Sequence, residues 1–535
     1  MAITVRKAIS SDAQAWVDLA KSCLSEDYPD KSVLSVDWAT RQLDADSSQH
    51  ETWVVDIDGN LAAAATFMGP TLPGFNPVAN VGRNLFSPTS YETGAAEELV
   101  SKISELAENF GGVLVIRISA SDKKQQQLFE SNGYTCAGFQ PFKHVIGVRE
   151  SFMFYVRIHA NLEGSRLPFS QSLPEVVEIA SCVLPGLSYQ KPDKINDGAT
   201  GYPLNSSDIT FQEVDAAEYK ILRIQVQSDG PLMEFSGGYN QGAGFMRNDE
   251  NLPIKSLLAM KGEQVVSGMS FVVDTHDRCV RVIDAFHVDD LSIGAIFSEL
   301  LRQAESDYSA VYTEADILIT APRMLKTAEQ LGFVPIAYLP AIFHKTVHRA
   351  DVAKLIKLNM VYSLEDTENT TSAQQLIDIV DESFQDQKLG HAIINLLSEL
   401  PSFEGLGDGE LRKISRLFTR KLFQAKEYIF DRGDSGNEAY VIMRGAVDIL
   451  LEEGTAPLAT FGNGQIFGEL AFLDGAARTA IAQANQPTIL LVIQRSEFTD
   501  LVQREPHLGM VIMRNIAMEL SNRLRLTNQA LSKKK

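Results

Sequence analysis

Short apolar runs separated by glycine-containing turns fill residues 426–454, KEYIFDRGDSGNEAYVIMRGAVDILLEEG. Runs of this length are too short for ordinary helices and are typical of the strands of a small barrel or jelly roll. The same punctuation continues through GNGQIFGELAFLDGAARTAIAQA at 462–484. We therefore predict a compact β-domain near the C-terminus.

The second of these stretches also carries the most specific chemistry of the chain. It predicts a single helical turn whose outward backbone amides and dipole can hold a phosphate. Arg478, nine residues beyond Glu469, can return across this turn and form a charge-assisted pair with the same phosphate. Glu469 is then placed to accept a hydrogen bond from a ribose hydroxyl. The residues of the turn are Gly468, Glu469, Leu470 and Ala471.

These residues resemble the cyclic nucleotide-binding domain of kinase regulatory subunits, cyclic-nucleotide-gated channels and bacterial catabolite-activator-type regulators. The resemblance covers about 398–525 and includes the complete cassette FGELAFLDGAARTA. In that family the glutamate binds the ribose 2′-hydroxyl and the arginine binds the cyclic phosphate, which implies these roles for Glu469 and Arg478. It also implies cAMP or cGMP as the regulatory ligand. Thr479 resembles a hydroxyl position of cGMP-selective members that cAMP binders also use, so the base stays open.

An apolar stripe follows the β-domain, with its members spaced for one face of a helix. The corresponding helix of the catabolite-activator family dimerises and leads into a helix-turn-helix. Only eleven residues follow Leu524, too few for a DNA-reading module. The stripe can form a homodimer seam or fold back as a lid over the base. Its members are Leu508, Ile512, Ile516, Leu520 and Leu524.

The N-terminal half contains two regions that share an order of strands and helices without sharing identities. Both resemble the GNAT-type N-acetyltransferase fold, in which an Arg/Gln-x-x-Gly-x-Gly/Ala loop caps the pyrophosphate of acetyl-CoA at a helix start. The first region has YETGAA, with Tyr91 in place of the Arg or Gln. The second region has DDLSIGA, in which two aspartates repel a pyrophosphate. The resemblance implies an acyl-CoA site at Gly94, Ala95 and Ala96 of the first region.

Catalytic residues of this family are only partly present. Phe129 and Ala328 stand four residues before Gly133 and Gly332, where the family often has a tyrosine general acid. A carboxylate on the fourth strand often deprotonates the amine. The strand VIDAFHV of the second region supplies the candidates Asp284 and His287, and the alternative, an ordinary strand face with satisfied polar groups, is the more common situation.

Charge is unevenly distributed along the chain. Residues 401–535 hold 17 basic and 16 acidic side chains, a net charge of +1. Since the whole chain has a net charge of −21, the first 400 residues carry −22. Such an acidic body repels phosphate backbones, and we expect no nucleic-acid partner there. No stretch approaches the ~20 apolar residues of a membrane span. The N-terminus lacks the apolar core of a signal peptide, so we expect no membrane partner and a cytoplasmic location.

A metal site is not expected. His344 and His348 in HKTVH have the helical i,i+4 spacing that can chelate zinc. No glutamate follows the first histidine, and no third ligand is evident.

The sequence thus predicts a multidomain α+β protein with two acetyltransferase-like α/β domains and a C-terminal β-barrel or jelly-roll domain with flanking helices. Two hypotheses stay open. In the first, cyclic nucleotide regulates an acyl-CoA-dependent N-acyltransferase that acts on an amine, such as a protein lysine. In the second, degenerate acetyltransferase folds serve a signalling adaptor as a partner-binding scaffold. The expected domains are 1–160 and 208–362 joined by a connection at 161–207, then a linker and helix at 363–397, and the nucleotide domain at 398–535.

Overall fold

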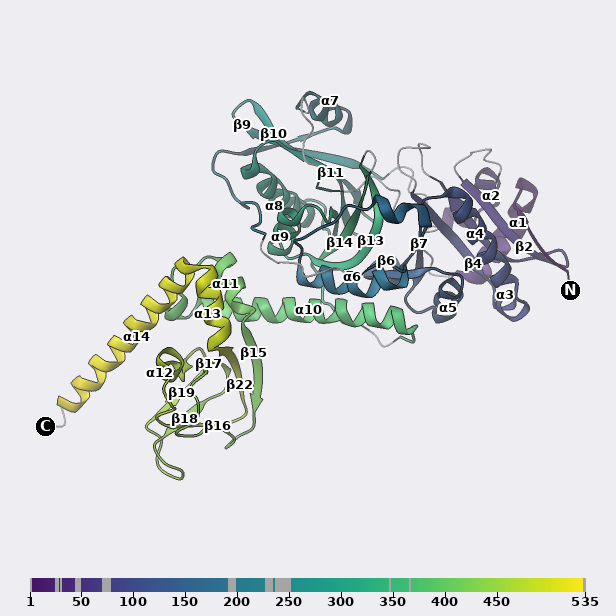
Figure 1. Cartoon of the computed structure of the whole chain (residues 1–535). Coiled ribbons are helices and arrows are strands. Elements are labelled where there is room, and N and C mark those ends of the chain that lie inside the picture. Colours follow the sequence, from purple (N-terminus) through teal and green to yellow (C-terminus); the bar gives the residue numbers. More distant parts are fainter. Residues whose placement is uncertain are drawn as a thin grey trace. The chain divides into compact units, whose positions relative to one another are not determined.

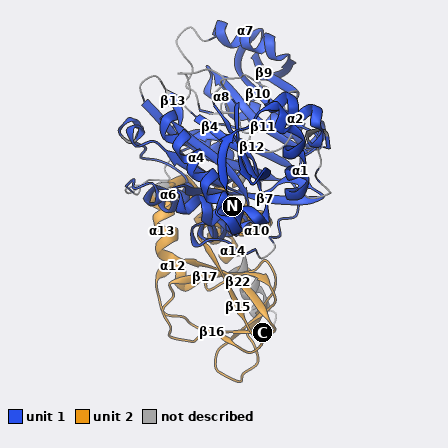
Figure 2. Cartoon of the chain, turned by 90° about the vertical axis from the view of Figure 1, so that its right-hand side faces the viewer, with its two compact units in different colours: residues 1–384 blue, residues 385–535 orange. Residues whose placement is uncertain are grey.

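The computed structural model contains two compact units, residues 1–384 and 385–535 (Figure 2). The structure describes residues 2–24, 28, 31–43, 50–69, 78–190, 199–226, 234–235, 252–345, 348–364 and 367–532. Mixed α+β architecture with a β-domain at the C-terminal end is confirmed.

Unit 1 is organised around one mixed sheet of 14 strands, with helices packed against it (Figure 1). Its first half contains β1 (Ile3–Lys7), α1 (Ala13–Cys23), α2 (Val36–Leu43), β2 (His50–Ile57), β3 (Asn60–Met68), β4 (Val78–Phe86), α3 (Pro88–Thr93), α4 (Ala95–Phe110), β5 (Val113–Ser119), α5 (Lys123–Ser131), β6 (Thr135–Ile146) and β7 (Val148–Ile158). After α6 (Pro174–Gly186), the second half contains β8 (Thr210–Val214), α7 (Ala216–Val226), β9 (Ile254–Lys261), β10 (Gln264–Asp274), β11 (Cys279–His287), α8 (Asp290–Ser306), β12 (Tyr312–Leu318), α9 (Pro322–Gln330), β13 (Val334–Lys345) and β14 (His348–Leu358).

The two halves repeat one topology, which confirms the repeated element order predicted from the sequence. The strand order is β1-β2-β3-β4-β5-β7-β6 in the first half and β8-β9-β10-β11-β12-β14-β13 in the second. In each half the fourth and fifth strands are parallel, and every other pairing is antiparallel. A bulge also repeats, in β6 and in β13. In each strand the residue after a proline has a positive φ, 52° at Phe142 and 55° at Ala341.

The halves meet at a close approach of β6 and β13. Gly138 pairs with Ala337, and a Cβ on Gly138 would lie 2.1 Å from the Ala337 Cβ and 2.6 Å from the Ile336 carbonyl oxygen. Only glycine permits this spacing without a backbone shift. The seam between the halves therefore depends on a residue without a side chain.

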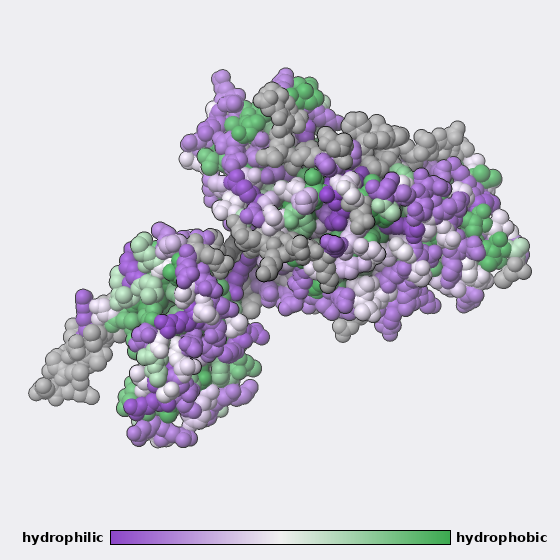
Figure 3. Space-filling model, viewed as in Figure 1, coloured by the Kyte–Doolittle hydropathy of each residue, from purple (hydrophilic) through white to green (hydrophobic). Residues whose placement is uncertain are grey.

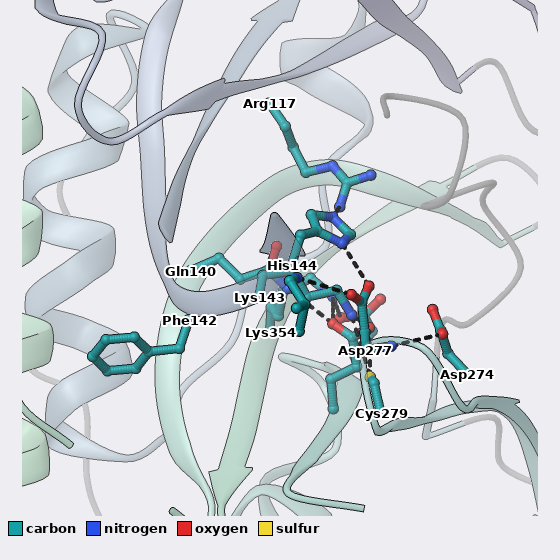
Figure 4. A network of polar contacts seen from close by, with 12 residues as sticks. Arg117, Gln140, Phe142, Lys143, His144, Asp274, Asp277, Cys279 and Lys354 are labelled. Atoms are coloured by element: carbon teal, nitrogen blue, oxygen red, sulfur yellow. Dashed lines mark hydrogen bonds and ion pairs between the residues drawn. The ribbon is translucent and has the colours of Figure 1, made fainter. Parts of the chain in front are cut away.

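A buried polar network crosses the same seam (Figure 4). Lys143 of β6 lies 2.7 Å from Glu314 of β12, and Lys354 of β14 lies 2.7 Å from Asp316 and 3.4 Å from Glu314. Burial opposes the charge of Glu314, but the two lysines hold its pKa well below the usual value. Burial raises the pKa of the neighbouring Cys279 thiol to about 12, so it stays protonated. Breaking such a pair leaves an uncompensated buried charge, so the network fixes how the halves join.

The histidines of HKTVH do not lie on a helix, so the interpretation of their spacing as helical is wrong. His344 ends β13 and His348 begins β14, with Lys345 paired to His348 and His344 to Arg349. Two residues that are four positions apart can also lie on the two paired strands of a hairpin, on either side of its short turn.

Unit 2 consists of helices around two four-stranded sheets, β15-β22-β17-β20 and β16-β21-β18-β19. A long helix, α10 (Thr371–Ser398), contains the boundary between the units. The remaining elements are α11 (Asp408–Ser415), β15 (Phe418–Phe423), β16 (Tyr428–Phe430), β17 (Glu438–Arg444), β18 (Val447–Leu450), β19 (Ala459–Phe461), β20 (Ile466–Phe467), α12 (Glu469–Asp474), β21 (Ile481–Ala484), β22 (Thr488–Gln494), α13 (Arg495–Arg504) and α14 (Pro506–Ser532).

We predict that His144 makes stability depend on pH. Arg117 Nη1 donates to His144 Nε2 at 3.1 Å, so Nδ1 carries the proton and donates to Asp277 at 2.7 Å. Burial, aided by Arg117, lowers the pKa of His144 from 6.5 to about 4. As the pH falls, the unfolded chain protonates His144 before the folded chain does. The contribution of neutral His144 to the free energy of unfolding is therefore fully present above pH 6.5 and falls by up to about 3 kcal/mol as the pH drops to 4.

Denaturant unfolding at several pH values measures this dependence. His144→Gln should flatten the curve between pH 4 and 6.5, whereas His159→Gln, at a half-buried site, should not. An unchanged slope in His144→Gln would contradict the assignment.

Candidate functional site

A tight turn positions the cassette predicted from the sequence. Gly468 is the N-cap of α12 (Glu469–Asp474), with φ 75° and ψ 4°, the left-handed region that glycine adopts at little cost. A Cβ there would lie 2.8 Å from Arg478 Nη1 and 3.1 Å from the Tyr440 ring. Glycine is thus required both by the backbone and by the neighbouring guanidinium. The predicted helical turn is confirmed, although α12 continues to Asp474.

Arg478 lies beneath this turn and is 4% exposed. Its Nη1 donates to the Gly468 carbonyl at 2.8 Å, and its Nη2 donates to the Glu438 carbonyl at 2.6 Å. The guanidinium lies 4.2 Å from the centre of the Phe430 ring, and its Nε is buried without a hydrogen-bond partner. Among the described residues, no carboxylate forms an ion pair with it. A buried cation held only by neutral acceptors is a prepared anion site.

The other residues of the cassette surround Arg478. Glu469 is the first residue of α12 and is 9% exposed, while Ala471 is buried. Leu470 is 54% exposed, so its side chain faces away from the core of the unit. Thr479 is exposed directly after Arg478. The structure therefore gathers Gly468, Glu469 and Arg478 around one turn and leaves Leu470 and Thr479 at its surface.

Two aromatic rings beside the arginine, and a third ring stacked on one of them, were not predicted. Phe430 and Tyr440 lie at 4.2 and 5.6 Å from the guanidinium, and the Tyr440 ring stacks on Phe467 with centroids 5.0 Å apart. The cation–π contacts of Phe430 and Tyr440 stabilise a buried positive charge. The sequence shows them as ordinary strand residues, because only the fold brings β16, β17 and β20 together.

The apolar stripe of α14 packs within its own unit over its first part. Leu508 and Ile512 are each 1% exposed in the core of unit 2, and Ile516 packs against the same core. Leu520 is partly buried, and the Leu524 side chain lies outside the described residues. The lid and the homodimer seam stay predictions for the later part of the stripe.

In unit 1 only Gly94 lies between α3 and α4, because Ala95 and Ala96 are already the first residues of α4 and not part of a loop. Gly94 has φ 80°, and among the described residues no atom lies within 4 Å of a Cβ built on it. The side chains of Ala95 and Ala96 are fully buried in the core. The first turn of α4 contains Glu97 and Glu98, whose charges oppose an anion at this helix end.

Asp284 and His287 are on one strand, but the structure does not bring them together. Asp284 pairs with Arg223 at 2.6 Å and accepts a hydrogen bond from the Tyr219 hydroxyl at 2.9 Å. Burial raises the Asp284 pKa despite these partners. His287 is 8% exposed and lies 3.4 Å from Glu234. Each candidate thus has its own polar partners.

Comparisons with known proteins agree with the geometry of unit 2. Residues 420–505 match the family model described as cyclic nucleotide-binding domain, and this part of the chain is a domain of that family. The chain is similar to the cyclic AMP receptor protein of Thermus thermophilus, with 34% identity over 23% of the chain and 57% of that protein. It is also similar to the cAMP-dependent protein kinase regulatory subunit of Emericella nidulans, with 30% identity over 23% of the chain and 29% of that protein.

The similarity is confined to part of each relative and part of this chain. The matched segment spans less than two thirds of the length of either relative. Among solved structures, Thermus thermophilus catabolite activator protein has 32% identity and a TM-score of 0.23, and covers 25% of this chain and 62% of that chain. A cyclic nucleotide-binding domain from Methylobacillus flagellatus has 23% identity and a TM-score of 0.26, with 28% and 85% coverage.

Within the described parts of the chain, helices that could cross a bilayer are absent. Hydrophilic residues also cover most of the face of unit 1 that Figure 3 shows.

We predict that Gly468→Ala destabilises unit 2 more than Gly454→Ala. Both glycines have φ 75°, so alanine costs about 1–2 kcal/mol at either position. Only Gly468 faces Arg478, since a Cβ at Gly454 meets no atom within 4 Å. The extra overlap should cost a further 1–3 kcal/mol, roughly, in denaturant unfolding. Equal losses would show that the arginine does not constrain the turn.

Proposed function

We propose that this chain is a cytoplasmic cyclic-nucleotide sensor whose ligand, cAMP or cGMP, binds at Arg478 and Glu469 and controls the N-terminal unit. The observation that carries the proposal is the buried Arg478 guanidinium, which has carbonyl acceptors and no carboxylate partner among the described residues. A cyclic phosphate supplies the missing negative charge. Glu469, on the adjoining turn, is the acceptor for the ribose 2′-hydroxyl.

The helix α10 is the proposed route from the sensor to unit 1. Ile393 and Leu397 near its end are in the core of unit 2. At its start, Ser372 and the preceding Thr370 donate hydrogen bonds to Glu130 of α5. One continuous helix therefore has side chains in both cores, and a shift of its packing in the sensor changes its contacts at α5. A coupling of about 1–3 kcal/mol would alter activity 5- to 150-fold.

Unit 1 is proposed to contain two acetyltransferase-like domains. Support comes from the repeated strand order, in which only the fourth and fifth strands run parallel and a helix follows the fourth strand. The open surface at Gly94 supports acetyl-CoA as the ligand of the first half. In this form of the proposal the nucleotide regulates acyl transfer to an amine, with Asp284 and His287 as candidate proton acceptors.

A non-catalytic signalling adaptor is the second candidate. The ion pair of Asp284 with Arg223 favours it, because a proton acceptor must first leave its partner. Phe129 and Ala328 supply no acid where the family resemblance calls for a tyrosine. Glu97 and Glu98 weaken an anion site at α4. In this form the nucleotide changes a surface of unit 1 that a partner protein binds.

We predict that Arg478→Gln removes nucleotide-dependent stabilisation. A ligand at 100 times its Kd stabilises the folded chain by about 2.7 kcal/mol, so millimolar cAMP or cGMP should raise the melting temperature of the parent chain. The variant loses the charge-assisted bond and should show little shift, whereas Arg444→Gln, at an exposed position, should behave as the parent. No shift in the parent with either nucleotide would overturn the sensor.

A second prediction separates enzyme from adaptor. Isothermal titration of the full chain with acetyl-CoA should show binding that Gly94→Asp weakens about tenfold and Gly94→Asn leaves unchanged, because only the former adds a negative charge. Both side chains tolerate the left-handed backbone of Gly94. Absence of binding, with and without cyclic nucleotide, would reject the enzyme. A nucleotide-stimulated acylation rate that Gly94→Asp abolishes would reject the adaptor.

A further inference from the structure

The repeat in unit 1 allows one half to be compared with the other at corresponding positions. In the first half β4 leads through α3 and α4 to the parallel strand β5, and in the second half β11 leads through α8 to β12. The dipeptide Gly94-Ala95 lies near the start of α4, and Gly294-Ala295 lies in the second turn of α8. These glycines therefore mark the same corner of the two halves.

A tyrosine fills this corner in both halves, beside the last residue of the fourth strand. The Tyr91 ring lies 5.8 Å from Phe86, and the Tyr202 ring lies 5.4 Å from His287. Tyr91 belongs to α3, directly after β4. Tyr202 belongs instead to the connection that precedes β8. In the second half the corner is therefore filled by a segment distant in sequence.

The backbone of that segment also covers the second glycine. A Cβ on Gly294 would lie 2.3 Å from the Pro203 carbonyl oxygen and 3.1 Å from that of Tyr202. At Gly94 no atom of the described residues lies within 4 Å of a Cβ. The two corners therefore differ over the part of the chain that the structure describes, since main chain lies against α8 at Gly294 and no such contact is found at Gly94.

Specific contacts hold the segment in place. The Tyr202 amide donates to Thr327 Oγ1 of α9 at 2.8 Å, and the Tyr202 hydroxyl donates to Glu234 at 2.6 Å. The Arg323 guanidinium lies 3.9 Å from the centre of the Tyr202 ring. Gly201 fits against α9, where a Cβ would lie 2.5 Å from Gln330 Oε1. The segment is therefore held by a hydrogen bond of its main chain, a buried hydrogen bond of the Tyr202 side chain and a cation–π contact with Arg323.

We propose that the segment Gly201–Pro203, which lies against Gly294 of α8 and Thr327 of α9, closes this corner of the second half to any ligand. The chain then binds no more than one acyl-CoA, in the first half, and Asp284 and His287 of β11 do not act as its proton acceptors. This inference rests on the proposed function only for the identity of that ligand. The closure itself follows from the contacts of Tyr202 and from the carbonyl oxygen of Pro203 against Gly294.

Hydrogen–deuterium exchange of the full chain, with and without saturating acetyl-CoA, tests the proposal. Without ligand, peptides covering 199–205 and the start of α8 should be protected, because the Tyr202 amide is bonded. Tyr202→Ala should remove this protection. The control Tyr189→Ala should not, since Tyr189 is a buried tyrosine of the same connection whose ring lies under Arg166 at 4.6 Å.

Each outcome is decisive. Protection of α4 by acetyl-CoA with no change at α8 supports the inference together with the proposed function. A change at α8 of the parent chain, or rapid exchange of 199–205 without ligand, overturns the closure. No change at either helix, with 199–205 protected and released by Tyr202→Ala, rejects acetyl-CoA as ligand while the closure stands.

Discussion

Unit 1 depends on the close approach of two backbones at Gly138 and Ala337. The absent side chain lets β6 and β13 pair, so that two seven-stranded halves become one sheet. The buried ions of Lys143 and Glu314 then cross the same seam. Because burying ions is costly unless each is paired, this network disfavours any other register between the halves. Together, a steric constraint and an electrostatic one give unit 1 a single way to assemble.

Unit 2 shows the opposite arrangement of charge. Where Glu314 has two lysines beside it, Arg478 has carbonyl oxygens and aromatic rings as its neighbours and, within the described ranges, no carboxylate in an ion pair. A structural role alone would favour a paired arginine, since an unpaired buried cation lowers stability. The arrangement is understandable if an anionic ligand completes the site. The two units thus use buried charge for different purposes, one to fix packing and the other to bind.

Sequence patterns predicted the structural features that are formed by residues close together in the sequence. The helical turn after Gly468 is formed by residues close in sequence, and it is confirmed. The spacing of His344 and His348 misled because four residues suit a helix turn and a hairpin alike. The rings around Arg478, the seam at Gly138 and the contact of Pro203 with Gly294 join distant segments. No local pattern specifies such pairings, so only the fold could reveal them.

The two halves of unit 1 share one strand order but differ at the corresponding corner, because the main chain of Pro203 lies against Gly294 in the second half. Close packing of this kind replaces contacts with water by contacts within the protein. In the second half Tyr202 occupies this corner. Its ring lies beneath the Arg323 guanidinium, and its hydroxyl donates a hydrogen bond to Glu234. The acidic excess of the first 400 residues fits the same view, since it disfavours anions everywhere except at a dedicated site.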